Sequence, residues 1–207
     1  MSKNVLFIKG TPLSAGSSRS MEVAEAFLEV YKQVNPKDKI IEKDLFNLDV
    51  PYIDGDVLSG WAAYAADKVP IGIEATKVAA LKAFTDEFLN VDKLIIQSPM
   101  WNLGIPPQLK GYLDTLVVAG TTFKYTPDGP VGLMTGKKAI YIHGSGGVYS
   151  DGKIPQHSDA YVHTILNFIG VDVAPTLWVE GIDFNPSAKE EIMKAALVKA
   201  KEAATTF

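Results

Sequence analysis

The sequence predicts an open α/β fold in which helices cover both faces of a parallel sheet. Short β-rich segments alternate along the chain with longer segments of helical periodicity. Several of the β-rich segments are apolar without strict alternation, as in strands that are buried on both faces. The chain has 207 residues, 47% of them hydrophobic, which is enough to bury a substantial core as one domain. We therefore expect a doubly wound, three-layer α/β/α sandwich.

Five strands and five helices make up the predicted alternation. The strands are expected at residues 5–9, 39–45, 93–98, 139–143 and 174–180. The helices are expected at about residues 20–34, 74–90, 107–118, 157–169 and 187–204. The last helix is predicted to begin with the capping-box sequence Ser187-Ala-Lys-Glu190.

Residues 46–73 interrupt the alternation. They contain glycine, proline and aromatic residues and are longer than a typical α/β connection, so they form either a functional insertion or a partly helical excursion. Trp61 and Tyr64 in this segment would either form a lid over a ligand or bury the segment itself.

Composition limits the function. The formal net charge is −4 with both signs mixed along the chain, so a nucleic-acid partner is not expected. No apolar stretch has the length of a membrane helix, and a cytoplasmic protein is the simplest expectation. The chain has no cysteine, which excludes disulfides and thiolate catalysis, so redox chemistry would require a bound cofactor.

Ligands of open α/β sheets bind outside the carboxyl ends of the strands, and the first loop there is residues 10–20. It contains four serines, a threonine and an arginine directly before a helix. Hydroxyls, backbone N–H groups and the helix dipole could bind a terminal phosphate, although an ordinary loop with Ser20 as N-cap fits equally well. The loop lacks the P-loop pattern of NTPases.

The second loop follows the strand at residues 93–98. Met100, Trp101, Asn102 and Leu103 place apolar surface beside hydrogen-bonding groups, which suits a planar heteroaromatic ring. The alternative is that Trp101 packs in the core.

The third loop, from His143 to Tyr149, contains three glycines that would let backbone amides approach the polar edge of a ring. The dinucleotide pattern G-x-G-x-x-G fails at Tyr149, and a plain turn is the alternative. The three histidines lack a common ligand spacing, so no metal site is expected. Together, a phosphate cup, a ring wall and a ring edge in this fold indicate flavin mononucleotide (FMN).

The chain also resembles the FMN-dependent NADH:azoreductases and quinone reductases, which have a flavodoxin-like fold. The resemblance covers nearly the whole chain, and its most specific parts are Pro99-Met-Trp-Asn-Leu103, Gln108-Leu-Lys-Gly-Tyr-Leu-Asp114, residues 120–133, Thr135-Gly-Lys-Lys138, Gly144-Ser-Gly-Gly147 and Phe168-Ile-Gly170.

This resemblance implies a single flavodoxin-like domain over residues 1–207, with a five-stranded parallel sheet in the order 2-1-3-4-5. It also implies a homodimer that binds FMN non-covalently at two sites on the subunit interface. The cofactor-binding positions would be Ser18, Arg19 and Ser20 at the phosphate, Met100, Trp101, Asn102 and Leu103 along the isoalloxazine, and Gly144, Ser145, Gly146 and Gly147 at its pyrimidine edge.

Tyr125 and Phe168 match family positions on the substrate side of the flavin, with Phe168 expected from the partner subunit. Two positions depart from the family, because Gly10 and Gly144 stand where several relatives carry serine and so lose hydroxyl contacts. Arg19 replaces an uncharged residue, and its charge could offset that loss.

The activity implied is ping-pong transfer of two electrons from NADH or NADPH, through FMN, to quinones and aromatic azo compounds. The flavin carries the chemistry, so no side-chain acid or base is assigned. Two alternatives remain at this point: an electron carrier that docks on partner enzymes, and a flavin reductase that supplies reduced FMN to a second enzyme.

Overall fold

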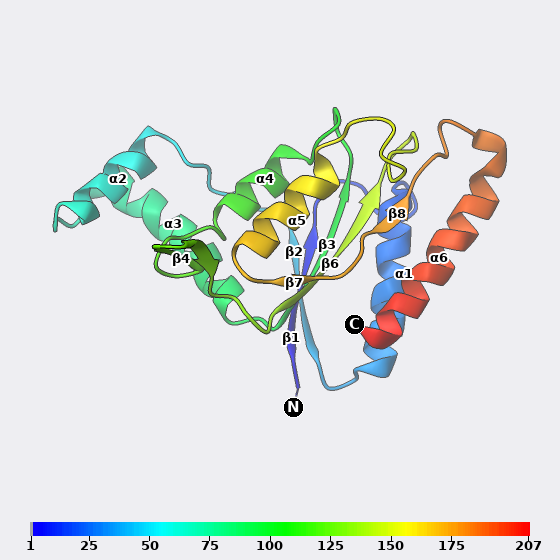
Figure 1. Ribbon diagram of the computed structural model, residues 1–207, viewed down its shortest axis with the longest axis horizontal. Helices are drawn as coiled ribbons and strands as arrows, with labels where there is room; N and C mark the ends of the chain where they lie inside the picture. Colours follow the sequence, from blue (N-terminus) through cyan, green and yellow to red (C-terminus); the bar gives the residue numbers. More distant parts are fainter. Residues whose placement is uncertain (1) are drawn as a thin grey trace.

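A sheet of parallel strands forms the centre of the computed structural model, which describes residues 2–207 (Figure 1). Its strands are β1 (Asn4–Lys9), β2 (Lys39–Asp44), β3 (Lys93–Pro99), β6 (Lys138–Gly144), β7 (Asp172–Val173) and β8 (Leu177–Val179). The order is β2-β1-β3-β6-β7, and β8 also pairs with β6. With β7 and β8 counted as one interrupted strand, this confirms the predicted order 2-1-3-4-5.

The interruption between β7 and β8 explains why the strand predicted at 174–180 is only partly correct. Ala139 pairs with Val173 and Ile142 with Leu177, so three residues stand opposite two of β6. An extra residue of this kind bends a strand and breaks its ladder. Pro175 lies within the break, where its missing N–H costs no ladder bond.

Five helices cover the two faces of the sheet. Helices α1 (Arg19–Val34) and α6 (Lys189–Thr206) pack on one face, and α3 (Gly72–Leu89), α4 (Pro107–Asp114) and α5 (Ser158–Phe168) lie on the other (Figure 1). Alternate strand residues divide between the two layers: Val5 and Phe7 join the α1 side, while Leu6 and Ile8 join the α4 and α5 side. This confirms the three-layer sandwich.

The segment 46–73 contains a further helix, α2 (Gly55–Ala65), so the structure has the partly helical excursion. Asp54 caps this helix by accepting a hydrogen bond from the Val57 N–H at 3.1 Å. Gly60 packs against α3, where an added Cβ would lie 2.7 Å from a methyl group of Val78. Figure 1 shows α2 at one end of the molecule, beyond α3.

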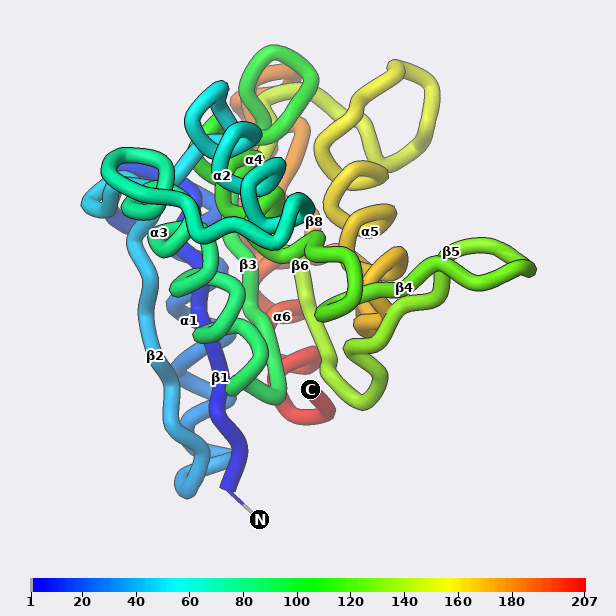
Figure 2. The backbone as a smooth tube through the Cα atoms, turned by 90° about the vertical axis from the view of Figure 1, so that its left-hand side faces the viewer, coloured from blue at the N-terminus to red at the C-terminus, as the bar shows by residue number. Residues whose placement is uncertain are grey.

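A β-hairpin that the sequence analysis did not predict joins α4 to β6. It consists of β4 (Phe123–Thr126) and β5 (Gly129–Gly132), and Figure 2 shows it projecting beside α5. Gly129 turns the chain with a φ of 115°, which suits glycine. The hairpin base is fixed by close backbone contact, since a Cβ on Gly132 would lie 2.2 Å from the backbone nitrogen of Gly170.

Two helix ends differ from the predictions. Helix α4 ends at Asp114 instead of residue 118, and the hydroxyl of Thr115 donates to the Tyr112 carbonyl at 2.7 Å. The capping box at Ser187 is wrong: a 3₁₀ turn over Pro186–Ala188 precedes α6, and the Ser187 hydroxyl donates to the Asn185 side chain instead of capping the helix.

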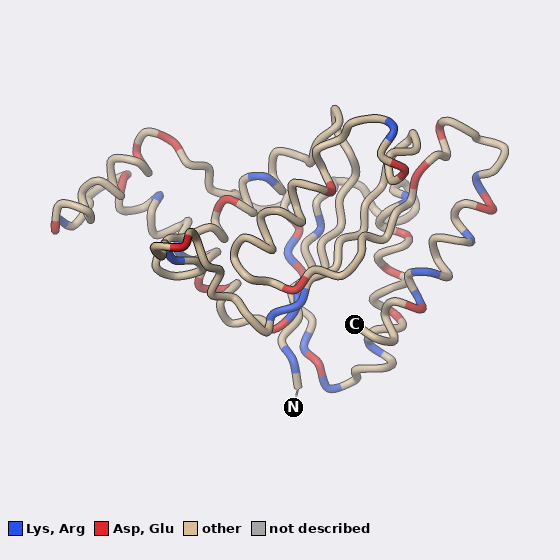
Figure 3. Tube along the Cα trace, viewed as in Figure 1, with Lys and Arg blue, Asp and Glu red and all other residues tan. Residues whose placement is uncertain are grey.

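Charges of both signs are interspersed along the chain (Figure 3). Within residues 2–207, no helix combines the length and the apolar character needed to cross a membrane.

Candidate functional site

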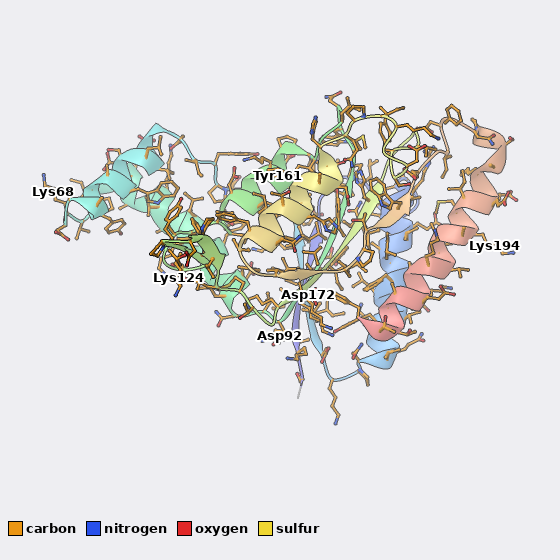
Figure 4. The ribbon with its side chains drawn as sticks, in the orientation of Figure 1. Lys68, Asp92, Lys124, Tyr161, Asp172 and Lys194 are labelled. Carbon is orange, nitrogen blue, oxygen red and sulfur yellow. The ribbon has the colours of Figure 1, made fainter. Side chains whose placement is uncertain are left out.

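The three loops predicted to form the site lie at the same edge of the sheet, where β1, β3 and β6 end. In Figure 4 the labels of Asp92, which precedes β3, and Asp172, which begins β7, mark the opposite edge. The loops are joined directly: the Met100 N–H donates to the Gly144 carbonyl at 2.7 Å. Ser20, in the first turn of α1, lies against Gly144.

The amino terminus of α1 has free donors. Ser18 is the N-cap, and its side chain accepts a hydrogen bond from the Met21 N–H at 3.4 Å. Within the described chain, the N–H groups of Arg19 and Ser20 have no partner, as expected for a first helical turn. Together with the positive end of the helix dipole, they favour an anion such as a phosphate.

Arg19 connects this helix start to the glycine loop. Its guanidinium lies 2.7 Å from the Asp183 carboxylate, and the Asp183 N–H donates to the Gly146 carbonyl at 3.0 Å. The hydrogen bond from Arg19 is the main cause that lowers the pKa of Asp183 below its usual value. Because a guanidinium carries five N–H donors, Arg19 retains donors for an anion while it is paired.

The second loop is a tight turn. The Trp101 N–H donates to the Gly104 carbonyl at 2.9 Å, and the Gly104 N–H donates back at 3.0 Å. Between them, Asn102 and Leu103 have φ values of 50° and 65°, and their N–H groups have no partner in the described chain. A leucine in the left-handed region stores strain, which is typical of functional sites.

The Trp101 side chain does not pack in the core. It is 40% exposed, and its ring packs against that of Phe46, whose centroid lies 5.7 Å away. Phe46 belongs to the segment 46–73, so that segment contacts the predicted ring wall. Leu103 is also exposed, and its carbonyl accepts a hydrogen bond from the His157 N–H at 2.7 Å.

The glycine loop turns its carbonyls inward. The Gly146 carbonyl accepts from Asp183 and from the Phe184 N–H, and the Gly147 carbonyl accepts from the Gly181 N–H. The Ser145 N–H donates to the Val179 carbonyl at 2.9 Å, so Ser145 offers no free backbone donor. The N–H groups of Gly146 and Gly147 are unpartnered within residues 2–207 and remain available to a ligand.

His143 lies fully buried beneath this loop. Its Nε2 lies 2.9 Å from the Ser158 hydroxyl, and its Nδ1 lies 2.9 Å from the Tyr141 hydroxyl. The Ser158 hydroxyl also donates to Gln156, and the Ser98 carbonyl lies 3.3 Å from Nδ1, so protein groups occupy both ring nitrogens. Burial lowers the pKa of His143 from 6.5 to about 4, so the ring is neutral at pH 7.

Tyr125 and Phe168 lie away from these loops within one chain. Tyr125 is on the β4–β5 hairpin and is 76% exposed, next to the labelled Lys124 in Figure 4. Phe168 ends α5, whose first residue, Ser158, contacts His143; at 1.5 Å per residue the helix separates these two ends by about 15 Å. Phe123 packs between Tyr125 and Phe168, with ring centroids 5.3 and 4.7 Å away.

Sequence reasoning missed several residues of this region. Gln97 is the clearest case, because it is a fully buried polar residue in an otherwise apolar part of β3, and that contrast was a usable signal. No feature of the sequence pointed to Asp183, because it belongs to this region only through its ion pair with Arg19, 164 positions earlier.

Comparisons with known proteins agree with this geometry. A family model described as "Flavodoxin-like fold" matches residues 3–204. The chain is 47% identical to FMN-dependent NADH:quinone oxidoreductase 2 of Listeria monocytogenes, and the match covers 100% of both chains. It is 44% identical to the protein of the same name from Bacillus thuringiensis, over 98% of this chain and 99% of that one.

Two solved structures are also similar. An azoreductase from Bacillus anthracis superimposes with a TM-score of 0.94 at 37% identity, and the match covers 100% of each chain. An FMN-dependent NADH-azoreductase from Bacillus anthracis, solved in complex with FMN, superimposes with a TM-score of 0.90 at 28% identity, over 100% of this chain and 99% of that one.

Proposed function

This chain belongs to the flavodoxin-like family that includes the FMN-dependent NADH:quinone oxidoreductases, and we propose that it binds FMN and transfers two electrons from NADH to quinones and aromatic azo compounds. The observation that carries this proposal is the set of free backbone donors at one edge of the sheet. They come from the start of α1, the turn at Asn102 and Leu103, and the loop at Gly146 and Gly147.

These donors fit the parts of FMN. Ser18, Arg19 and Ser20 would hold the phosphate at the positive end of α1. Met100, Trp101, Asn102 and Leu103 would line the ring system, and Gly144, Ser145, Gly146 and Gly147 would border its pyrimidine edge. Such donors also stabilise negative charge on the ring, because they are fixed in place before the charge develops.

Bound FMN would supply the chemistry, by accepting a hydride from a nicotinamide and passing two electrons to the acceptor. The protein would contribute orientation. His143 is neutral, buried and already hydrogen-bonded on both ring nitrogens, so we assign it no acid or base role. NADH is favoured over NADPH by the names of the relatives.

We further propose that two copies of the chain form the active unit. Tyr125 and Phe168 would shape the substrate side of the flavin, yet both lie away from the FMN loops of their own chain, so a partner subunit would have to bring them there. A cytoplasmic location and a single domain with an insertion at 46–73 remain predictions of the sequence.

Exposed apolar side chains support the dimer. Eight large hydrophobic side chains between residues 52 and 73 are exposed: Tyr52, Ile53, Leu58, Trp61, Tyr64, Val69, Ile71 and Ile73. A groove of about 760 Å³ is bordered by two of them, Trp61 and Tyr64, together with Leu81, Val118 and Phe123. Exposed apolar surface of this extent is typical of a protein interface. Sedimentation analysis should give the mass of two chains, and a monomer at working concentration would contradict the dimer.

FMN binding can be tested by titrating the apoprotein and following the quenching of flavin fluorescence. Arg19→Gln should weaken FMN binding about tenfold, because a charge-assisted contact to the phosphate is lost. Lys194→Gln on α6, labelled far from the loops in Figure 4, is the matched charge control and should bind FMN normally. If Arg19→Gln binds FMN as tightly as Lys194→Gln does, there is no phosphate site at the start of α1.

A further inference from the structure

Gln97 has no assigned role, and its environment is unusual. It lies on β3 with no exposed surface, on the same side as Ile95 and facing the α1 layer. Its Nε2 donates to the Ser20 hydroxyl at 2.8 Å. Its Oε1 is buried and has no partner among the residues that the structure describes. A buried amide with an unsatisfied oxygen costs free energy, so an apolar residue would serve the core better.

The surrounding backbone packs closely on both residues. A Cβ on Gly144 would lie 2.9 Å from both Cβ and Oγ of Ser20. A Cβ on Gly10 would lie 2.7 Å from the carbonyl oxygen of Gln97 and 2.9 Å from the Ser98 Cβ. Both glycines therefore permit close packing of the backbone around Gln97 and Ser20.

This contact determines where the Ser20 proton points. Since Gln97 donates to it, the hydroxyl oxygen is an acceptor there and its own proton must be directed elsewhere. Among the described residues, the other hydrogen-bond partner of the Ser20 hydroxyl is Ser18 Oγ, at a long 3.4 Å. The structure has Nε2, and not Oε1, facing Ser20; the opposite orientation of the amide would take up the Ser20 proton itself, and Gln97→Met would then tighten FMN binding instead of weakening it.

We propose that Gln97 is a positioning residue that orients the Ser20 hydroxyl as a donor to the flavin phosphate, and so favours FMN over the unphosphorylated flavin. The inference rests on the proposed function, because it needs the phosphate at the amino terminus of α1. Gln97 acts through Ser20 and does not itself touch the ligand. Its effect is therefore confined to ligands that carry the phosphate.

The test compares the affinities of the apoprotein for FMN and for riboflavin, measured by fluorescence quenching. Gln97→Met keeps a side chain of similar length without its hydrogen bond and should weaken FMN binding about three- to tenfold. Riboflavin binding should not change. In a Ser20→Ala background, Gln97→Met should have no further effect, because the group it orients is gone. Gln33→Met, in the last turn of α1, is the matched control.

Three results would overturn the proposal. If the wild type prefers FMN but Gln97→Met weakens both flavins equally, Gln97 is only structural. If its effect adds to that of Ser20→Ala, it does not act through Ser20. If the wild type binds both flavins equally, the phosphate site itself is wrong, which separates failure of the proposed function from failure of this inference. Gln97→Leu is the second variant should Gln97→Met not fold.

Discussion

Acidification should destabilise this protein through His143. The imidazole is fully buried beneath the glycine loop, and burial lowers its pKa from 6.5 to about 4. Ser158 and Tyr141 occupy its two ring nitrogens. The Ser98 carbonyl and the charges of Asp159 and Glu180 raise its pKa but are outweighed by burial.

The sign follows from proton binding. As the pH falls through 6.5, the imidazole is protonated in the unfolded chain but stays neutral in the fold until the pH approaches 4. The unfolded state then binds more protons, so the free energy of unfolding decreases across this window and is unaffected above it. The penalty is about 2 kcal/mol between pH 7 and pH 5 and approaches about 3 kcal/mol below pH 4.

Urea unfolding at a series of pH values measures this loss, and His143→Gln supplies the reference. Glutamine keeps a donor and an acceptor but does not titrate, so subtracting its stability curve removes the contribution of every other group. The difference between the two proteins should be constant above pH 7 and should fall by about 2 kcal/mol by pH 5. A difference that stays flat from pH 7 to pH 4.5 would refute the claim that His143 is held neutral.

Three substitutions test other parts of the structure. Gly144→Ala should destabilise the fold by about 1–3 kcal/mol and weaken FMN binding, because its Cβ would press on Ser20. In the control Gly16→Ala, the new Cβ meets no atom of the described residues within 4 Å, so this variant should be tolerated. Equal thermal stabilities of the two variants would contradict this reasoning. Leu103→Gly should raise the free energy of unfolding by about 1 kcal/mol by relieving the left-handed backbone, and a loss of stability would show that no strain is stored there. Tyr112→Phe should leave stability unchanged or raise it by up to about 1 kcal/mol, because the buried hydroxyl lacks a partner in the described chain; a clear loss in urea unfolding would reveal an unrecognised partner.

The arrangement of the sheet could be predicted because its signals are local. Apolar runs such as residues 93–98 and 139–143 identify buried parallel strands wherever they occur, and loops at their carboxyl ends meet at one edge. The β4–β5 hairpin was missed, although Pro127-Asp128-Gly129 between two short β-rich stretches is a turn signal. The capping box failed because Pro186 starts a separate turn that holds Ser187 out of the helix.

The contacts within the site could not be predicted in the same way. Gln97 meets Ser20 across 77 positions, and Arg19 meets Asp183 across 164. Such pairs depend on the packing of distant elements, and no periodicity in the sequence encodes them. The N–H groups of Gly146 and Gly147, which lack a partner within residues 2–207, likewise depend on which carbonyls the loop turns inward.

An anaerobic absorbance titration of the FMN-loaded protein tests the proposed activity most directly. NADH should bleach the flavin absorbance at about one equivalent per bound FMN, and a benzoquinone added afterwards should restore it, as two-electron transfer from NADH to quinone requires. If FMN binds but neither NADH nor NADPH bleaches it, the protein is not a pyridine-nucleotide reductase, and the electron-carrier alternative takes its place.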